Sequence, residues 1–73
     1  MKPQTFGSRL RGKRRSLDTA QTELAAAVGI TQRHLSKLEN DAGDPSWRVA
    51  LKLADALDVS LDFLAGRSNG STP

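Results

Sequence analysis

Four polar side chains between residues 32 and 37 have the types and the spacing to read the edges of nucleic-acid bases. They stand at i, i+1, i+4 and i+5 of a predicted helix, and so on one side of it; they are Gln32, Arg33, Ser36 and Lys37. A glutamine amide can pair with N6 and N7 of adenine, and arginine or lysine can donate to O6 and N7 of guanine. The same side chains are common on solvated helix surfaces, so their types alone leave both interpretations open.

The residues around them predict two short helices joined by a tight turn at Gly29. Apolar residues recur at helical spacing on both sides of the turn, at Leu24, Ala25, Val28, Leu35 and Leu38. Gly29 can take the positive φ that ends a helix, and Thr31 is a good N-cap for the next one. Ile30 and Leu35 have the spacing of a hydrophobic staple, which fixes the angle at which the chain enters the second helix. Helix, tight turn and helix together form a helix-turn-helix pattern.

Taken as a set, these residues resemble the DNA-binding motif of the phage repressor/Cro-type, or XRE, family. The matching positions are Gln21, Leu24, Ala25, Gly29, Thr31, Gln32, Leu35, Leu38, Glu39 and Asn40. Flanking matches extend the resemblance from about residue 9 to residue 66. It implies an all-α, five-helix bundle of the lambda repressor-like kind, in which the helix at 31–39 enters the major groove of DNA.

Local signals predict three more helices around the motif. They are 5–16, capped by Thr5; 47–57, capped by Ser46; and 61–65, capped by Ser60 and ended by Gly66. We expect the domain to cover 5–66, with a disordered N-terminus at 1–4 and a disordered tail at 67–73.

Two positions depart from the family pattern, and one glycine is ambiguous. Ala20 stands where the family usually has Thr, so Asp18 or Thr19 is expected to cap the second helix. Asp58 stands where the family often has Gly, and Asp is less suited to a left-handed helix end. Gly12 inside the first helix costs about 1 kcal/mol relative to Ala, and either close packing or simple tolerance could account for it.

Arg14 interrupts an otherwise apolar face of the first helix and needs a partner if it is buried. The resemblance implies a structural ion pair with Glu39, which a guanidinium can hold through two hydrogen bonds. The alternative is that both side chains are exposed and unrelated.

The resemblance also implies contacts to the DNA backbone. Gln21 would meet a phosphate at a helix N-terminus, where free N–H groups and the helix dipole favour anions. Thr31 and Asn40 match further backbone-contacting positions, although capping alone is sufficient to account for Thr31. Arg48 is another candidate, and His34 is expected to be a neutral surface or phosphate-side residue rather than a pH switch.

Composition narrows the class of protein. The 73 residues form one small domain, which at this size buries only about 60% of its unfolded surface. There is no Cys, a single His and no catalytic or phosphate-loop motif, so we expect no enzyme, no metal and no cofactor. No apolar run reaches membrane-spanning length and no signal peptide is apparent, which suits the cytoplasm.

Charge is distributed unevenly along the chain. Residues 1–15 hold six basic residues and no acidic one, whereas 41–73 hold three basic and five acidic residues. A basic N-terminal part and an acidic C-terminal part suit a protein that turns one side toward a polyanion such as double-stranded DNA. A solvated basic helix would give the same charge distribution.

The sequence therefore favours a sequence-specific transcriptional regulator, a repressor. Each copy of the domain would read one half-site, and a homodimer would read the whole palindrome. Dimer contacts are expected from Leu51, Val59, Leu61 and Phe63. The alternative is a protein-interaction module, such as an antitoxin or adaptor, whose main partner is another protein. Trp47 is expected to cover the loop before it, with a contact to the sugar–phosphate backbone as the other possibility.

Overall fold

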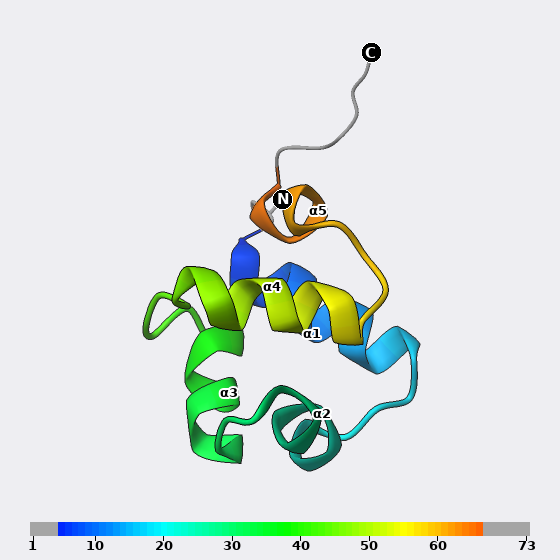
Figure 1. Cartoon of the computed structure of the whole chain (residues 1–73), viewed down its shortest axis with the longest axis vertical. Coiled ribbons are helices and arrows are strands. Elements are labelled where there is room, and N and C mark those ends of the chain that lie inside the picture. Colours follow the sequence, from blue (N-terminus) through cyan, green and yellow to red (C-terminus); the bar gives the residue numbers. More distant parts are fainter. Residues whose placement is uncertain (1–4, 67–73) are drawn as a thin grey trace.

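The computed structural model describes residues 5–66, which form five helices without a strand (Figure 1). They are α1 Phe6–Ser16, α2 Gln21–Val28, α3 Gln32–Glu39, α4 Trp47–Ala56 and α5 Leu61–Ala65. In Figure 1, α4 crosses the middle of the molecule, with α2 and α3 below it and α5 above it. The all-α, five-helix prediction is confirmed. The disorder predicted for 1–4 and 67–73 lies outside the described residues.

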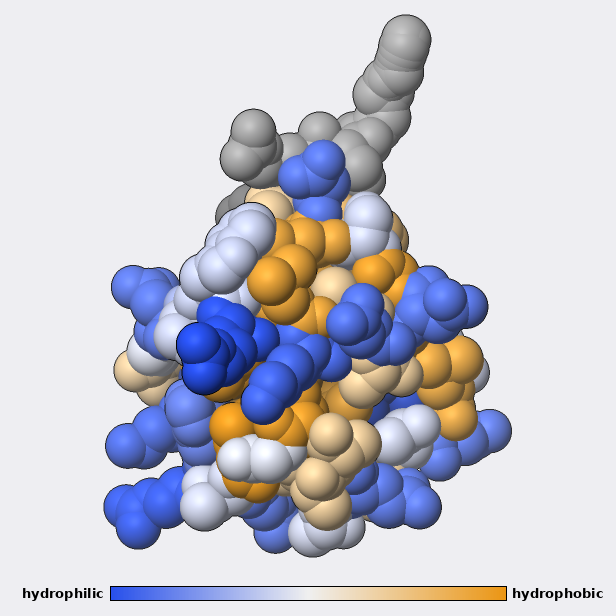
Figure 2. Space-filling model, in the orientation of Figure 1, coloured by the Kyte–Doolittle hydropathy of each residue, from blue (hydrophilic) through white to orange (hydrophobic). Residues whose placement is uncertain are grey.

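The core is one apolar cluster to which all five helices contribute. Its largest fully buried side chains are Leu10, Leu35, Leu38, Leu53, Leu57 and Leu64. Burial of each is worth about 1.5–3 kcal/mol. Ile30 is partly buried and packs against the cluster that contains Leu35. Apolar side chains also reach the surface, and Figure 2 shows them gathered where α5 lies over α4.

The prediction that Asp18 or Thr19 caps α2 is wrong. The N-cap is Ala20, which has no capping side chain; instead the carboxylate of Glu23 accepts a hydrogen bond of 2.9 Å from the Ala20 N–H. The preceding residues are engaged in ending α1. Asp18 is in the left-handed region at φ 55°, and the Thr19 N–H donates to the Arg14 carbonyl. A residue that closes one helix in this way is not placed to cap the next.

Aspartate serves as the left-handed residue at three helix ends. Asp18, Asp41 and Asp58 follow the ends of α1, α3 and α4 at φ 55°, 56° and 57°. At the end of α4, the Val59 N–H donates to the Ala54 carbonyl, so the break is closed as in a glycine-ended helix. Asp58 thus adopts the conformation for which the family often uses glycine.

The helices α1 and α3 approach closely at Gly7. A Cβ atom there would lie 2.5 Å from the Leu38 carbonyl oxygen, so no larger residue fits without movement of the backbone. Asp41 joins the same contact, because its carboxylate accepts from the Gly7 N–H at 3.0 Å and from the Thr5 hydroxyl at 2.6 Å. Gly12 differs, since a Cβ added there would have no neighbouring atom within 4 Å. Close packing therefore does not account for Gly12.

Candidate nucleic-acid interface

The helix α3 packs one face against the core and exposes the opposite face to solvent. Leu35 and Leu38 are buried in the core, whereas Gln32, Arg33 and Lys37 are exposed on the other side. Ser36 is half-buried, and its carbonyl oxygen accepts from the Asn40 amide at 2.9 Å. Within residues 5–66 no hydrogen bond or ion pair holds the side chains of Arg33 and Lys37. Three of the four predicted base-reading side chains are therefore presented outward by a rigid helix.

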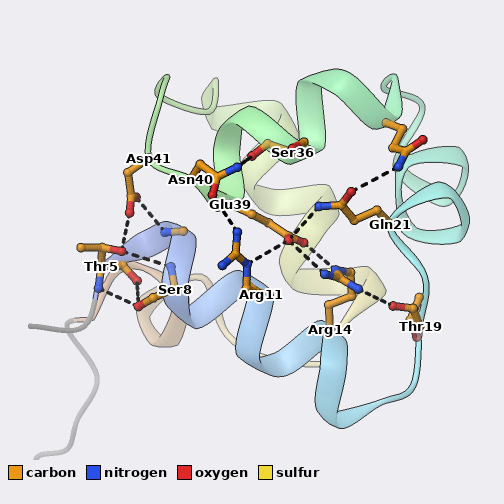
Figure 3. Close-up of polar contacts among 12 residues, drawn as sticks. Thr5, Ser8, Arg11, Arg14, Thr19, Gln21, Ser36, Glu39, Asn40 and Asp41 are labelled. Carbon is orange, nitrogen blue, oxygen red and sulfur yellow. Dashed lines mark hydrogen bonds and ion pairs between the residues drawn. The ribbon is translucent and has the colours of Figure 1, made fainter. Parts of the chain in front are cut away.

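Glu39, at the end of α3, lies at the centre of a buried polar cluster (Figure 3). Arg14 holds its carboxylate through two hydrogen bonds, Nε to Oε2 at 2.6 Å and Nη2 to Oε1 at 3.0 Å. Arg14 also donates to the Thr19 carbonyl at 2.8 Å. Arg11 adds an ion pair at 3.5 Å. In the part of the chain that the structure describes, no buried side-chain polar atom lacks a partner, so this cluster is fully satisfied.

The cluster keeps Glu39 ionised. Burial alone would raise the pKa of Glu39, but hydrogen bonds from Arg14 and Gln21 and the charges of Arg14 and Arg11 outweigh it and lower the pKa. The pKa of Arg14 is raised, mainly by its hydrogen bond to Glu39. The carboxylate therefore acts as a permanent acceptor at neutral pH.

The side chains of Gln21 and Gln32 are joined across the turn. Gln21 donates through Nε2 to Glu39 at 3.0 Å, and its Oε1 accepts from the Gln32 amide at 3.3 Å. A glutamine amide has two N–H donors and one carbonyl acceptor. Gln32 therefore keeps one N–H and its Oε1 for another molecule, which is the pair of groups that adenine N7 and N6 require.

The candidate phosphate-contacting residues lie near α3 and at its ends. Thr31 caps α3 by accepting from the His34 N–H at 3.0 Å, which leaves its hydroxyl proton available to a phosphate. His34 and Arg48 are exposed, the latter in the first turn of α4. In Figure 1, α3 and the start of α4 lie on the same side of the molecule.

The side chain of Asn40 already has a partner at each end. Its Oδ1 accepts from Arg11 at 2.7 Å and its Nδ2 donates to the Ser36 carbonyl. The sequence analysis counted Arg11 only among the six basic residues of 1–15 and missed this bond. The available signal was the spacing of Arg11 and Arg14, which puts them on one side of α1.

Three arginines of the basic stretch at the start of the chain contact other parts of the fold. Arg14 is paired with Glu39, and Arg11 with Glu39 and Asn40. The guanidinium of Arg9 lies against Gly66 at the end of α5, where a Cβ on that glycine would be 2.6 Å from it. The fold therefore uses these three arginines in contacts between its elements, and for Arg9 and Arg11 the sequence did not predict such contacts.

The predicted dimer residues lie on α4, on α5 and in the link between them, and they differ in exposure. Leu51 and Phe63 are 40% and 39% exposed, whereas Val59 and Leu61 are partly buried against the core. Trp47 is 70% exposed, so the expectation that it covers the loop is wrong. Exposed apolar side chains of this size are candidates for contact with another molecule.

Among the described residues, none of the helices has the length and apolarity to span a bilayer. In the same range, no group of three or more His, Asp or Glu residues is placed to hold a metal ion.

Comparisons with known proteins agree with the geometry. The family model described as Helix-turn-helix matches residues 10–64. The chain is 36% identical over 59 residues to the phage CTXφ transcriptional repressor RstR of Vibrio cholerae, covering 81% of this chain and 53% of RstR. It is 34% identical over 67 residues to the regulator ImmR of Bacillus subtilis, covering 92% and 53%. The chain thus spans about half the length of these curated relatives.

Its structure is similar to that of the P22 c2 repressor, solved in complex with a synthetic operator. The two superpose with a TM-score of 0.86 at 30% identity, covering 90% of this chain and all of the c2 chain. With a family match over 10–64 and relatives above 30% identity, the chain belongs to the XRE-type helix-turn-helix family.

Proposed function

We propose that this chain is a sequence-specific, double-stranded DNA-binding transcriptional regulator, a repressor, that reads the major groove with α3. The observation that carries the proposal is the solvent-exposed face of α3. Gln32, Arg33 and Lys37 are exposed there, while the opposite face of the helix is buried in the core. RstR is named as a transcriptional repressor, and the c2 structure contains an operator. Such a regulator would act in the cytoplasm, where operator DNA lies.

The base contacts follow from side-chain chemistry. Gln32 would pair with an adenine, while Arg33 and Lys37 would donate to guanine O6 and N7. Ser36, half-buried between them, has a hydroxyl that can donate to or accept from any base it reaches. Residues at the N-terminal end of a recognition helix lie nearest the bases, which favours Gln32 and Arg33 over Lys37.

Phosphate contacts would set the position of the domain on the duplex. We assign them to Gln21 and Thr31, which keep a free donor at the starts of α2 and α3, and to the exposed His34, Asn40 and Arg48. Asn40 would contribute its second amide hydrogen, since the first is bonded to Ser36.

Two copies related by a twofold axis would read the two halves of a palindrome about 10 base pairs apart, or a multiple of that. The exposed Leu51 and Phe63 and the partly buried Val59 and Leu61 would supply apolar contacts for such a homodimer.

The test is selection of bound duplexes from a random library, followed by fluorescence titration on the selected site and on a scrambled duplex. We expect a defined, symmetric site. Arg33→Ala should lose discrimination between the two duplexes, whereas Arg48→Ala should weaken both equally. Equal binding of both duplexes by the native protein would refute sequence-specific reading.

A second candidate is a protein-interaction module such as an antitoxin or adaptor. The 70% exposure of Trp47, next to the exposed apolar residues of α4, favours it. The salt dependence of binding distinguishes the two functions, because DNA binding weakens steeply with added salt and an apolar protein contact does not.

A further inference from the structure

A hollow on the surface lies between the exposed side of α1 and the end of α3. On α1 it is lined by Ser8, Arg11, Gly12 and Arg15, and on the other side by Asn40 and Asp41. Figure 3 shows Arg11 reaching across from α1 to Asn40, which is one of the residues that we propose contact the DNA backbone. The hollow therefore adjoins the proposed interface, although none of the phosphate contacts proposed above comes from α1.

Gly12, in the wall of this hollow, is not required by the described part of the fold. Glycine inside a helix lowers its stability relative to alanine. Gly12 does not have the positive φ that would favour a glycine, and a Cβ there would meet no atom within 4 Å. Glycine is also used where another molecule approaches the backbone closely. Its missing side chain leaves room beside α1 for a group that belongs to another molecule.

Three side chains around the hollow can donate hydrogen bonds to an anion. Arg15 is exposed, and within residues 5–66 no hydrogen bond or ion pair holds its side chain. Arg11 donates through Nη2 to Asn40 at 2.7 Å and pairs through Nε with Glu39, which leaves other N–H groups of its guanidinium. Asn40 keeps its second amide hydrogen, since the first is bonded to the Ser36 carbonyl.

The two carboxylates at the hollow are already engaged. Glu39 is buried and is held by Arg14 through two hydrogen bonds. Asp41 accepts from the Gly7 N–H at 3.0 Å, near the start of α1. From Gly7 to Arg15 the helix extends about 12 Å, so Asp41 lies at the other end of the hollow from Arg15. A negatively charged group would therefore be favoured at the end that Arg15 forms.

We infer that the hollow receives a phosphate group of the DNA backbone and that Gly12 leaves the space for it. The inference rests on the proposed function and adds a contact from α1 to it. Guanidinium groups bind phosphate oxygens through charge-assisted hydrogen bonds, and Arg11 and Arg15 are four residues apart, on one side of α1. A methyl group at position 12 would lie beside them and hold the phosphate away. A backbone contact of this kind adds affinity without base preference.

The first test is Gly12→Ala in the full chain, with fluorescence titration on a selected duplex and on a scrambled one. We expect the affinity for both duplexes to fall about fivefold, because the added methyl group displaces the phosphate from its donors. Thermal unfolding followed by circular dichroism should change in the opposite direction, with a higher melting temperature. A variant that is more stable and yet binds less tightly separates a ligand contact from damage to the fold.

Arg15→Gln tests the charge at the hollow. We expect it to weaken both duplexes alike and to lower the steepness of log affinity against log salt concentration by about one. The matched control is Lys52→Gln, which removes one exposed positive charge from α4, outside the hollow. It should keep the salt dependence of the native protein.

The outcomes distinguish this inference from the proposed function. If Gly12→Ala binds both duplexes as tightly as the native protein, the role of the hollow is overturned. An unchanged salt dependence in Arg15→Gln, or an equal change in Lys52→Gln, overturns it too. In each case the proposed function stands if the native protein prefers the selected duplex. If the native protein binds the two duplexes equally, sequence-specific reading fails, and Gly12→Ala still decides whether the hollow meets DNA.

Discussion

The contact between α1 and α3 and the surface formed by α4 and α5 are built from different interactions. At the first, Arg14 and Glu39 are buried and fully hydrogen-bonded, and Gly7 allows the two backbones to approach closely. On the second, Leu51 and Phe63 are partly exposed apolar side chains. Hydrogen bonds require a narrow range of distances and angles, whereas apolar contacts form in many geometries. The first region therefore sets the position of the recognition helix, and the second is suited to contact with another molecule.

Removal of the Glu39 carboxylate should have the largest effect on stability. Glu39→Ala leaves the buried guanidinium of Arg14 without its partner, and we expect a loss of about 3–5 kcal/mol in the free energy of unfolding. A domain of this size has about 4–11 kcal/mol in total. Urea unfolding monitored by circular dichroism measures the loss. Asp55→Ala, which removes an exposed carboxylate on α4, is the control and should change stability by no more than about 0.5 kcal/mol.

Acid should remove part of the same stabilisation. The folded-state pKa of Glu39 lies below its unfolded value, so the contribution is fully present above the unfolded pKa of about 4.3 and is lost as pH falls through the folded pKa. Unfolding at a series of pH values in the native protein and in Glu39→Gln tests this. We expect a shallower acid slope in the variant, and identical slopes would contradict the assignment.

The close approach of α1 and α3 should be sensitive to one added methyl group. Gly7→Ala places a Cβ against the Leu38 carbonyl, and we expect a cost of about 1–3 kcal/mol. The matched control is Gly12→Ala on the same helix, where the space is open and the higher helix propensity of alanine should add about 1 kcal/mol. Thermal melts of both variants suffice; a cost at Gly12 as large as that at Gly7 would refute the contrast.

A polar substitution on the α4–α5 surface should leave the fold nearly unchanged. Leu51→Gln alters a side chain that is 40% exposed, and we expect a change in unfolding free energy below about 1 kcal/mol. Sedimentation should nevertheless show weaker self-association, and binding to a duplex with two half-sites should weaken more than binding to one half-site. A stability loss near that of Glu39→Ala would mean that the two regions do not differ as described.

Helix positions were largely predictable from the sequence, because their signals are local. Thr31, Ser46 and Ser60 were expected as N-caps, and each accepts a hydrogen bond from the N–H three residues later. The cap of α2 was not predicted, because the choice between Asp18 and Thr19 ignored that both are engaged in ending α1. Competition between two adjacent helix ends is not visible in the propensity of either residue.

The sequence predicted which residues belong to the candidate site better than it predicted the hydrogen bonds among them. The pairing of Arg14 with Glu39 was expected from a family resemblance, and the structure joins them at 2.6 Å. The bonds of Asp41 to Gly7 and of Arg11 to Asn40 were not foreseen. Asp and Arg usually lie in solvent, so the presence of either residue in a sequence does not predict such a bond.

By itself, the sequence determined the number and limits of the helices and the outward face of α3, because caps, glycine turns and apolar spacing act within a few residues. Only the tertiary structure decided which arginines are bound within the protein and which way the amides of Gln21 and Gln32 face. These outcomes depend on Glu39, which reaches Gln21 and Arg14 across 18 and 25 positions of the chain. Hydrogen bonds over such separations exist only once the helices have packed.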